Sequence, residues 1–355
     1  MIRIGPVVLD APLCQAGLAG YSDRAMRTVA RRRGCPYAVT EALLDTVLCA
    51  GGEGLRKSVD LSDEDHPVAG QVIGSEPDTM ATAAKLLASA GFDVIDLNFA
   101  CPVKKIKNKA RGGHMLRDLP RALAVLQACR DALPPHVPTT VSLRRAFDDT
   151  PEAAELFERI VAAAFDYGYA AVRVHARTVE QKYLGRASWP FLAEFKRRYP
   201  HRVILGSGDV LTAHDVVRLL RETGVDVAWV ARGAIGNPWI FAHARQLLAD
   251  PDATLTPPSL HEQRQALLEH FELAMQIHGE QVAGRRMRKM GIKYARFHPQ
   301  AADVKAAFIA VHSLRDWHAV LDRFYRDDGP GVFPDPMSAD EVNTDPALAS
   351  CEAGD

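Results

Sequence analysis

Residues 93–102 read Asp-Val-Ile-Asp-Leu-Asn-Phe-Ala-Cys-Pro, which places a cysteine directly after an alternating, strand-like run. A thiol is one of the few side chains that can give or take a proton near neutral pH. A free cysteine considered alone is more often a small, buried apolar residue. In a barrel of parallel strands, however, side chains at the carboxyl ends of the strands face the active site. Because other polar residues end the neighbouring runs, we predict a chemical role for Cys101.

Two glycine-rich segments, residues 206–209 (Gly-Ser-Gly-Asp) and 231–236 (Ala-Arg-Gly-Ala-Ile-Gly), follow the last two strand-like runs. Many barrels hold a phosphate at these two loops, with backbone N–H groups facing the anion. Glycine lets the backbone approach closely, and an arginine adds a bidentate charge. We therefore predict a phosphate site formed by Ser207, Gly208, Asp209, Arg232 and Gly233.

Two further polar residues point to the same end of the predicted barrel. His175 ends the sixth run, and Gln71 lies two residues before the third run ends, with inward parity. Amide and imidazole groups around a phosphate-anchored ligand suggest flavin mononucleotide (FMN), whose pyrimidine edge needs several hydrogen bonds. A structural role in the core is the alternative for both residues.

The elements that position these residues alternate between strand-like and helical patterns. The strand-like runs number about eight, which is the closure number of a (β/α)8 barrel; they lie at residues 13–16, 37–40, 68–73, 93–98, 139–144, 171–175, 202–205 and 225–230. We therefore predict an α/β fold, a TIM barrel, with residues 4–9 as a small hairpin that covers its floor.

The pattern changes after residue 249. Pro251, Pro257 and Pro258 mark a linker, and residues 259–262 (Ser-Leu-His-Glu) have the form of a capping box that starts a helix. Apolar residues at a spacing of three and four continue to residue 324. We predict a barrel domain over residues 1–250, an all-helical domain over 251–328 and, because 329–355 lacks periodicity, a loose tail there.

Composition excludes some classes of protein. The 355 residues are 47% hydrophobic, enough for a full core, and the net charge of −1 gives no global preference for nucleic acid. Local basic clusters exist at residues 31–33, 104–109 and 285–293, although solvated surfaces explain such clusters equally well. Six cysteines without a Cys-x-x-Cys pair predict neither metal nor disulfides. No apolar run reaches about 18 residues, so we expect a cytoplasmic protein with no membrane contact and, lacking any sign of a protein partner, a monomer.

Several motifs, in order along the chain, resemble those of the tRNA-dihydrouridine synthases. They are residues 18–27 (Leu-Ala-Gly-Tyr-Ser-Asp-Arg-Ala-Met-Arg), 39–42 (Val-Thr-Glu-Ala), 98–105 (Asn-Phe-Ala-Cys-Pro-Val-Lys-Lys), 175–178 (His-Ala-Arg-Thr) and 232–241 (Arg-Gly-Ala-Ile-Gly-Asn-Pro-Trp-Ile-Phe). The resemblance extends from about Ile4 to Tyr325.

The resemblance implies an FMN-binding barrel, a helical domain that binds tRNA, and NADPH as the reductant. Hydride would pass to C6 of a uracil while Cys101, as general acid, protonates C5. Asn98 would hold the flavin or the uracil edge, and Arg177 would position the substrate. A thiol with a pKa near ~8.5 suits proton donation at neutral pH. The RNA phosphates would meet Lys104, Lys105, Arg286 and Lys289.

One departure from the family pattern concerns charge. The family has a flavin-contacting lysine in the fifth strand, where this chain has Ser142. Arg173 shares a face with His175 on the adjacent strand, so we predict that it replaces the lysine, the alternative being an outward arginine after a bulge. Two other functions stay open: a flavin barrel that reduces a small molecule, and a flavin-free RNA-binding protein.

Overall fold

The computed structural model describes residues 1–102 and 110–335. Eight parallel strands close into a ring because β4 pairs with both β3 and β6, and β11 pairs with β3. In ring order they are β3 (Leu13–Gln15), β4 (Ala38–Val39), β6 (Val68–Ile73), β7 (Val94–Phe99), β8 (Thr139–Arg144), β9 (Ala171–His175), β10 (Val203–Ser207) and β11 (Val227–Val230). The predicted barrel is confirmed. A two-residue strand, β5 (Leu43–Leu44), pairs with β6 outside the ring.

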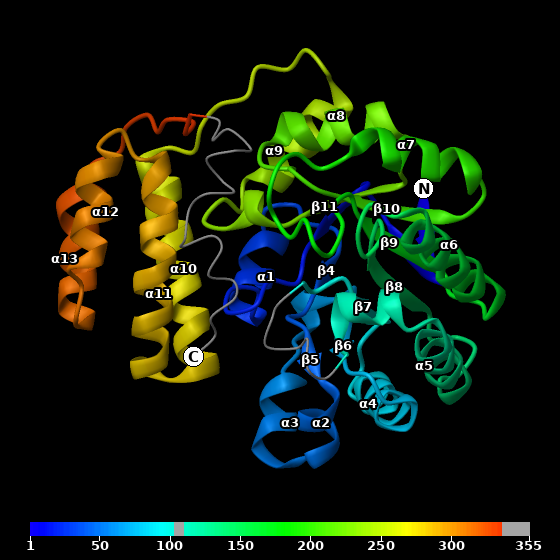
Figure 1. Ribbon diagram of the computed structural model, residues 1–355. Helices are drawn as coiled ribbons and strands as arrows, with labels where there is room; N and C mark the ends of the chain where they lie inside the picture. Colours follow the sequence, from blue (N-terminus) through cyan, green and yellow to red (C-terminus); the bar gives the residue numbers. More distant parts are fainter. Residues whose placement is uncertain (103–109, 336–355) are drawn as a thin grey trace.

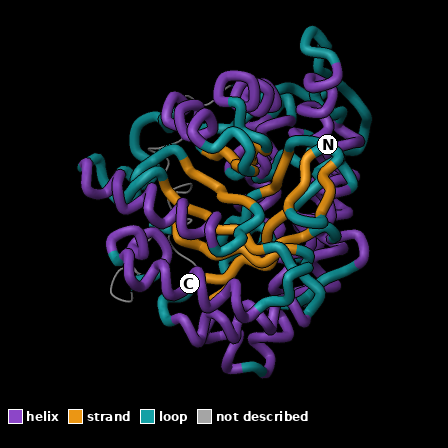
Figure 2. Tube along the Cα trace, turned by 90° about the vertical axis from the view of Figure 1, so that its right-hand side faces the viewer, coloured by secondary structure: helices purple, strands orange, loops and turns teal. Residues whose placement is uncertain are grey.

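Helices surround the strands, as the two perpendicular views in Figures 1 and 2 show. They are α1 (Arg24–Arg31), α2 (Asp45–Ala50), α3 (Gly52–Ser58), α4 (Pro77–Ser89), α5 (Leu119–Ala132), α6 (Pro151–Asp166), α7 (Trp189–Arg198), α8 (Ala213–Thr223) and α9 (Ile240–Ala249). Polar N-caps start several of them, for example Thr150 on α6 and Thr212, with its capping box, on α8. These caps satisfy N–H groups that have no partner inside the helix.

A hairpin of β1 (Ile2–Ile4) and β2 (Val7–Leu9) covers the floor of the barrel, as the sequence predicts. Ile4 and Leu9 are buried and pack with interior side chains of the barrel, among them Tyr37 and Val227. The interior of the barrel near the hairpin is therefore filled by apolar side chains, and the polar interior residues lie nearer the carboxyl ends of the strands.

A helical lobe follows the barrel and lies beside it (Figure 1). It consists of α10 (Leu260–His278), α11 (Glu280–Tyr294), α12 (Ala301–Ile309) and α13 (Leu314–Phe324). The predicted capping box of Ser259 and Glu262 starts α10. The lobe packs around Trp317, whose ring lies 4.4 Å from that of Phe271. Glu269 of α10 ties the lobe to the barrel through Arg32 and Arg33, at 2.7 and 2.8 Å.

The packed part of the chain extends past residue 329, where a loose tail was predicted. The backbone oxygen of Gly329 accepts from Leu260 N, and Val332 N donates to Phe297 O, both at 2.9 Å. The Phe333 ring contacts His243 of α9. Residues 329–335 thus join the helical lobe to the barrel. The rest of the predicted tail, residues 336–355, lies outside the described residues. Among the described residues, no helix is long and apolar enough to cross a membrane.

Candidate active site

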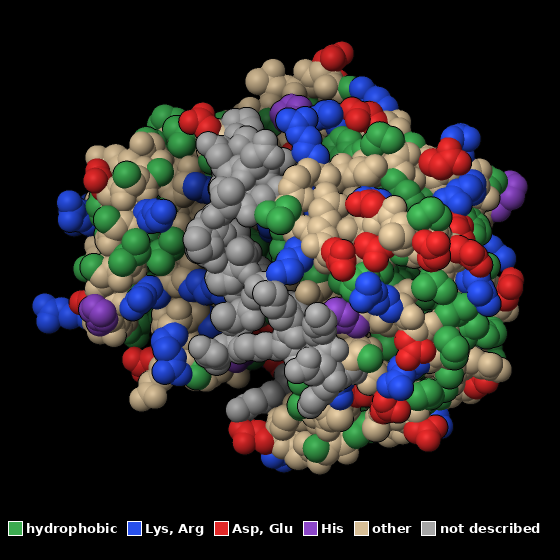
Figure 3. Space-filling view, viewed as in Figure 1, with side chains coloured by type: hydrophobic (Ala, Val, Ile, Leu, Met, Phe, Trp, Pro, Cys, Tyr) green, Lys and Arg blue, Asp and Glu red, His purple; other side chains and the backbone are tan. Residues whose placement is uncertain are grey.

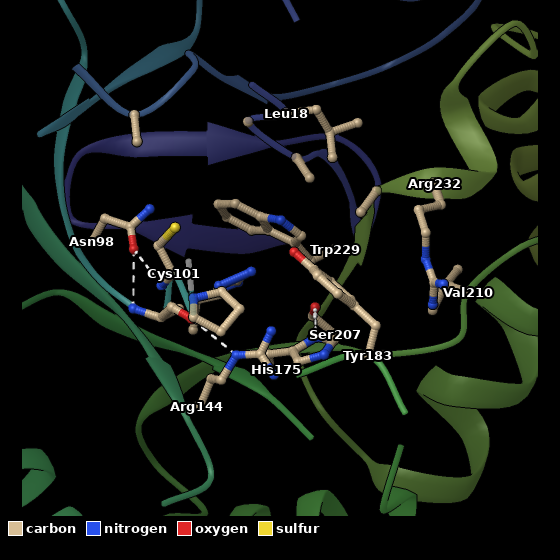
Figure 4. A pocket seen from close by; sticks show the side chains of 18 of the residues that line it. Leu18, Asn98, Cys101, Arg144, His175, Tyr183, Ser207, Val210, Trp229 and Arg232 are labelled. Carbon is tan, nitrogen blue, oxygen red and sulfur yellow. Dashed lines mark hydrogen bonds between the residues drawn. The ribbon is translucent and has the colours of Figure 1, made fainter. Parts of the chain in front are cut away.

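A pocket of about 1100 Å³, counted out to its open mouth, lies at the carboxyl ends of the barrel strands (Figure 4). Parallel strands bring their carboxyl ends to one rim, so residues distant in sequence meet there. Of the predicted site residues, those that line it are Gln71, Asn98, Cys101, Arg173, His175, Ser207, Gly208, Asp209 and Arg232.

Cys101 is held at the wall of this pocket through the backbone on both sides of it. Asn98 Oδ1 accepts hydrogen bonds from the N–H groups of Ala100 and Cys101, both at 3.0 Å (Figure 4). Gly113 N donates to Cys101 O at 2.9 Å, and Arg144 Nε donates to Ala100 O at 2.9 Å. The backbone of Cys101 therefore has a fixed position, and the residue is partly exposed and lines the pocket.

Below Cys101, buried polar side chains form a connected network. Asn98 Nδ2 donates to Gln71 Oε1 at 2.7 Å, and Gln71 Nε2 donates to Asp96 Oδ2 at 2.7 Å. Asp96 also accepts from Thr140 at 2.6 Å and from Ser142 at 2.8 Å. Burial raises the pKa of the Asp96 carboxyl, and these donors oppose the rise. Ser142 has no exposed surface and lies beneath the lining instead of in it.

Arg173 points into the barrel and forms part of the pocket floor. Strand β9 pairs with β8 and β10 in continuous register, so the alternative of an outward arginine after a bulge is wrong. Its Cζ lies 4.7 Å from the centroid of the Trp229 ring. Burial lowers its pKa, which nearby Asp96 opposes, yet within the described chain Arg173 forms no ion pair. Its Nε is buried without a hydrogen-bond partner there.

His175 is buried beside Ser207, with its Nδ1 2.9 Å from the serine hydroxyl. Burial, followed by the charge of Arg144, holds the pKa of this imidazole well below its usual range. A neutral ring leaves Nε2 as one donor or one acceptor. Nε2 has no partner among the described residues and is buried, so the pocket carries an unused hydrogen-bonding group at this point.

The two glycine-rich loops meet as predicted, with different roles for their members. Gly208 has φ +132, and a Cβ there would lie 2.5 Å from Ala187 Cβ, so only glycine fits this part of the lining. Gly233 does not line the pocket; it packs on the carbonyl oxygen of Val210, which a Cβ would approach to 2.7 Å. Its small size brings the loops together.

Arg177 is placed differently from the prediction that it positions the substrate. It has no exposed surface and does not line the pocket. Its Nη2 instead contacts Asp209 Oδ1 at 2.7 Å, and Asp209 also pairs with Arg232 at 3.1 Å. The loop that carries Leu184 folds over the guanidinium and accepts from it. Arg177 thus fixes the pocket wall from behind.

The predicted RNA contacts on α11 face the barrel. Arg286 Nη1 lies 3.0 Å from Asp23 Oδ2, which His278 also contacts at 2.8 Å. Lys289 Nζ lies 3.6 Å above the Tyr21 ring. These residues therefore flank the β3–α1 loop, whose residues 18 and 19 line the pocket. Lys104 and Lys105 lie outside the described residues.

Sequence reasoning missed the large polar and aromatic side chains of the lining at Arg144, Tyr183 and Trp229. The Tyr183 ring lies between two guanidinium groups, 5.3 Å from that of Arg144 and 5.8 Å from that of Arg232. Strand parity carries the signal for Arg144, two residues after Ser142, and for Trp229, two residues before the glycine-rich loop. Tyr183 lies in a loop, where parity gives no direction.

The fold and the site define a barrel enzyme whose pocket is lined by a thiol, an imidazole and a largely buried guanidinium. A family model described as dihydrouridine synthase (Dus) matches residues 14–326. The tRNA-dihydrouridine synthase B of Xanthomonas campestris pv. campestris is 34% identical over 305 residues, which are 86% of this chain and 90% of that protein. A probable tRNA-dihydrouridine synthase of Mycobacterium tuberculosis is 31% identical over 94% of this chain and 86% of its own length. The chain therefore belongs to the dihydrouridine synthase family.

Solved structures share the barrel. Histamine dehydrogenase from Rhizobium sp. 4-9 matches with a TM-score of 0.52 at 14% identity, over 70% of this chain and 47% of that one. A 2-naphthoyl-CoA reductase matches with a TM-score of 0.55 at 12% identity, over 70% and 51%. The chain spans about half the length of these proteins, and the likeness shows the fold alone.

Proposed function

We propose that this protein reduces uridine to 5,6-dihydrouridine in tRNA, with bound FMN and with NADPH as the reductant. The observation that carries the proposal is the position of Cys101, held by its backbone at the wall of a pocket with unused buried hydrogen-bonding groups. Family membership and the tRNA-modifying relatives support the substrate.

The residues present fit a flavin mononucleotide. His175 Nε2 and Arg173 Nε are buried hydrogen-bonding atoms without a partner in the described chain, as expected where a polar ring edge binds. Gly208 and Arg232 line the part of the pocket where a phosphate would meet backbone N–H groups and a guanidinium. When bound, FMN would supply the hydride for C6 of the uracil.

The side chains then have separate tasks. The Cys101 thiol would hold the proton destined for C5 of the uracil, and its fixed backbone would keep it within reach. Asn98 already uses its carbonyl oxygen on the cysteine backbone and one amide hydrogen on Gln71. It therefore has one N–H to offer to the flavin or uracil edge.

A uridine in folded tRNA must leave its base stack to enter such a pocket, and phosphate contacts must compensate the cost. In the view of Figure 3, Lys and Arg side chains are more common than Asp and Glu on the helical lobe at the left, whereas both signs of charge mix over the barrel. This distribution supports RNA binding along the lobe and favours it over a small-molecule substrate.

A flavin-free RNA-binding protein would leave His175 Nε2 and Arg173 Nε without a partner at the pocket, whereas a bound flavin ring would supply one. The test is to map dihydrouridine in the RNA of a strain that lacks this gene. We expect loss of dihydrouridine at specific tRNA positions and its return with the intact gene. An unchanged map would contradict the proposed substrate, and a purified protein without flavin absorbance would contradict the proposed cofactor.

A further inference from the structure

We propose that Asp96 is a positioning residue for Cys101, which it orients through Gln71 and Asn98. The inference deepens the proposed function and rests on it for its catalytic part only. Asp96 does not line the pocket and has 1% of its surface exposed, so it cannot touch a ligand. Its effect must pass through the side chains that contact it.

The hydrogen bonds between Asp96 and Cys101 can run in only one direction. Asp96 Oδ2 accepts from Gln71 Nε2, so Gln71 presents its NH₂ group to Asp96 and its carbonyl to Asn98. At the other end, the backbone N–H of Cys101 only donates, so Asn98 must present its carbonyl there and its NH₂ group to Gln71. Both fixed ends demand the same orientation of the two amides between them.

Each link is short and rests on rigid backbone. The two amide links are both 2.7 Å, and the two bonds to the backbone of Ala100 and Cys101 are both 3.0 Å. Gln71 and Asp96 are register partners on β6 and β7. Thr140 and Ser142 of β8 hold the carboxylate from the opposite side. Residues on three adjacent strands thus fix the position of the Asp96 carboxylate, which is one end of this series of hydrogen bonds.

Loss of the acceptor at position 96 would remove one of the two ends that fix this direction and leave only the backbone N–H groups of Ala100 and Cys101 to hold Asn98. In Asp96→Leu, the NH₂ group of Gln71 would be buried without its acceptor, which is unfavourable in a packed barrel. The amide would then turn or recruit water, and Asn98 would lose the neighbour that orients it. The backbone N–H groups of Ala100 and Cys101 would be left with a poorly placed acceptor.

The variant Asp96→Asn tests the direction of the hydrogen bonds separately from the charge at position 96. The asparagine carbonyl can still accept from Gln71 and Ser142, while its NH₂ group faces Thr140, whose hydroxyl can accept as well as donate. The donor-to-acceptor direction of these hydrogen bonds is therefore preserved in Asp96→Asn, although a carboxyl group is replaced by a neutral amide. Thr140→Val is a matched control, because it removes a donor to Asp96 that is outside the path to Cys101.

The test measures amide hydrogen exchange at Ala100 and Cys101 in the full chain, and kcat and KM for tRNA in the same variants. We expect exchange to accelerate about tenfold in Asp96→Leu and to keep the wild-type rate in Asp96→Asn and Thr140→Val. We expect kcat to fall about 10- to 100-fold in Asp96→Leu with an unchanged KM, and to recover largely in Asp96→Asn. Gln71→Leu cuts the same path and replaces Asp96→Leu if that variant does not fold.

Wild-type exchange in both Asp96→Leu and Gln71→Leu would overturn the proposal. Equal acceleration in Asp96→Asn and Asp96→Leu would also overturn it, because charge and not direction would then be the cause. The exchange measurement needs no turnover. A wild-type protein that forms no dihydrouridine would thus contradict the proposed function and leave the positioning role to be decided by exchange.

Discussion

Arg173 and Ser142 are register partners on β9 and β8, but only Arg173 lines the pocket. The Ser142 hydroxyl is used by Asp96, whereas the guanidinium of Arg173 lines the pocket. A cation at the pyrimidine end of a flavin stabilises the negative charge of its reduced form. Arg173 thus lines the pocket proposed for the flavin, and its replacement of the family's lysine stays a prediction.

We predict that Arg173→Ala weakens FMN binding by roughly 10- to 100-fold, the loss expected for a charge-assisted hydrogen bond. Ser142→Lys in that background should restore part of the affinity, because it places a cation on the neighbouring strand. Titration of FMN fluorescence measures both effects. Arg202→Ala removes an exposed arginine at the opposite end of β10 and should change nothing. Unaltered affinity and reduction rate in Arg173→Ala would remove Arg173 from the cofactor site.

Single residues could be predicted where strand parity applies. Asn98, Arg173 and His175 lie on strands, and each enters the pocket lining as their spacing indicates. Arg177 could not be placed, because the sequence does not reveal that the loop of residues 184–185 folds over its guanidinium. The sequence also does not reveal that the Asn98 amide donates a hydrogen bond inside the protein, because its acceptor is Gln71 on another strand.

Among the elements, the eight ring strands agree with the predicted runs to within two residues at each end, because short runs rich in β-branched and apolar residues are bounded by turn residues. The short β5 and the α2–α3 pair lack such a run and were not predicted. On α11, a cluster read as one basic surface divides between two faces. Arg286 and Lys289 face the barrel, whereas Arg285 and Arg288 line a groove beside α13.

The packing of α10 against α11 should depend on pH through His270. This side chain is buried against the Tyr294 hydroxyl, and burial lowers its pKa to about 4, which Asp23 and Glu269 oppose. In the unfolded chain a histidine takes up its proton near pH ~6.5. The unfolded state therefore binds more protons between these values. Stability is full above pH ~6.5 and falls as the pH drops towards 4.

We predict that the free energy of unfolding decreases by about 2 kcal/mol through this residue between pH ~6.5 and ~5. Denaturant unfolding of the wild type and of His270→Phe at both pH values measures the part of the decrease in unfolding free energy that is due to His270. His214→Gln removes an exposed histidine and serves as the control. An identical decrease in wild type and His270→Phe would show that His270 is not the group that titrates.

In the whole molecule, the helical lobe and the barrel mouth are joined by Asp23, which caps α1 and contacts His278 and Arg286.

We predict that tRNA affinity falls with salt. Alanine at Lys104, Lys105 or Lys289 should lower the slope of log affinity against log salt concentration by ~0.7–0.9 per lost phosphate contact. Arg286→Ala should act less on the slope, because Asp23 already compensates its charge. Filter binding across a salt series measures these slopes, with Arg159→Ala, on α6, as the control. Affinity that ignores both salt and these substitutions would contradict RNA binding at this surface.

The central claim is that Cys101 protonates a uracil in tRNA at a bound flavin. The most direct test incubates the purified chain with FMN, NADPH and unmodified tRNA and quantifies dihydrouridine, for wild type and Cys101→Ala. The account predicts dihydrouridine with the wild type and a roughly 10²- to 10⁴-fold slower formation with Cys101→Ala, while flavin binding and its reduction by NADPH are retained. Dihydrouridine formed by Cys101→Ala at the wild-type rate, or none formed by a flavin-loaded, NADPH-reducible wild type, would contradict it.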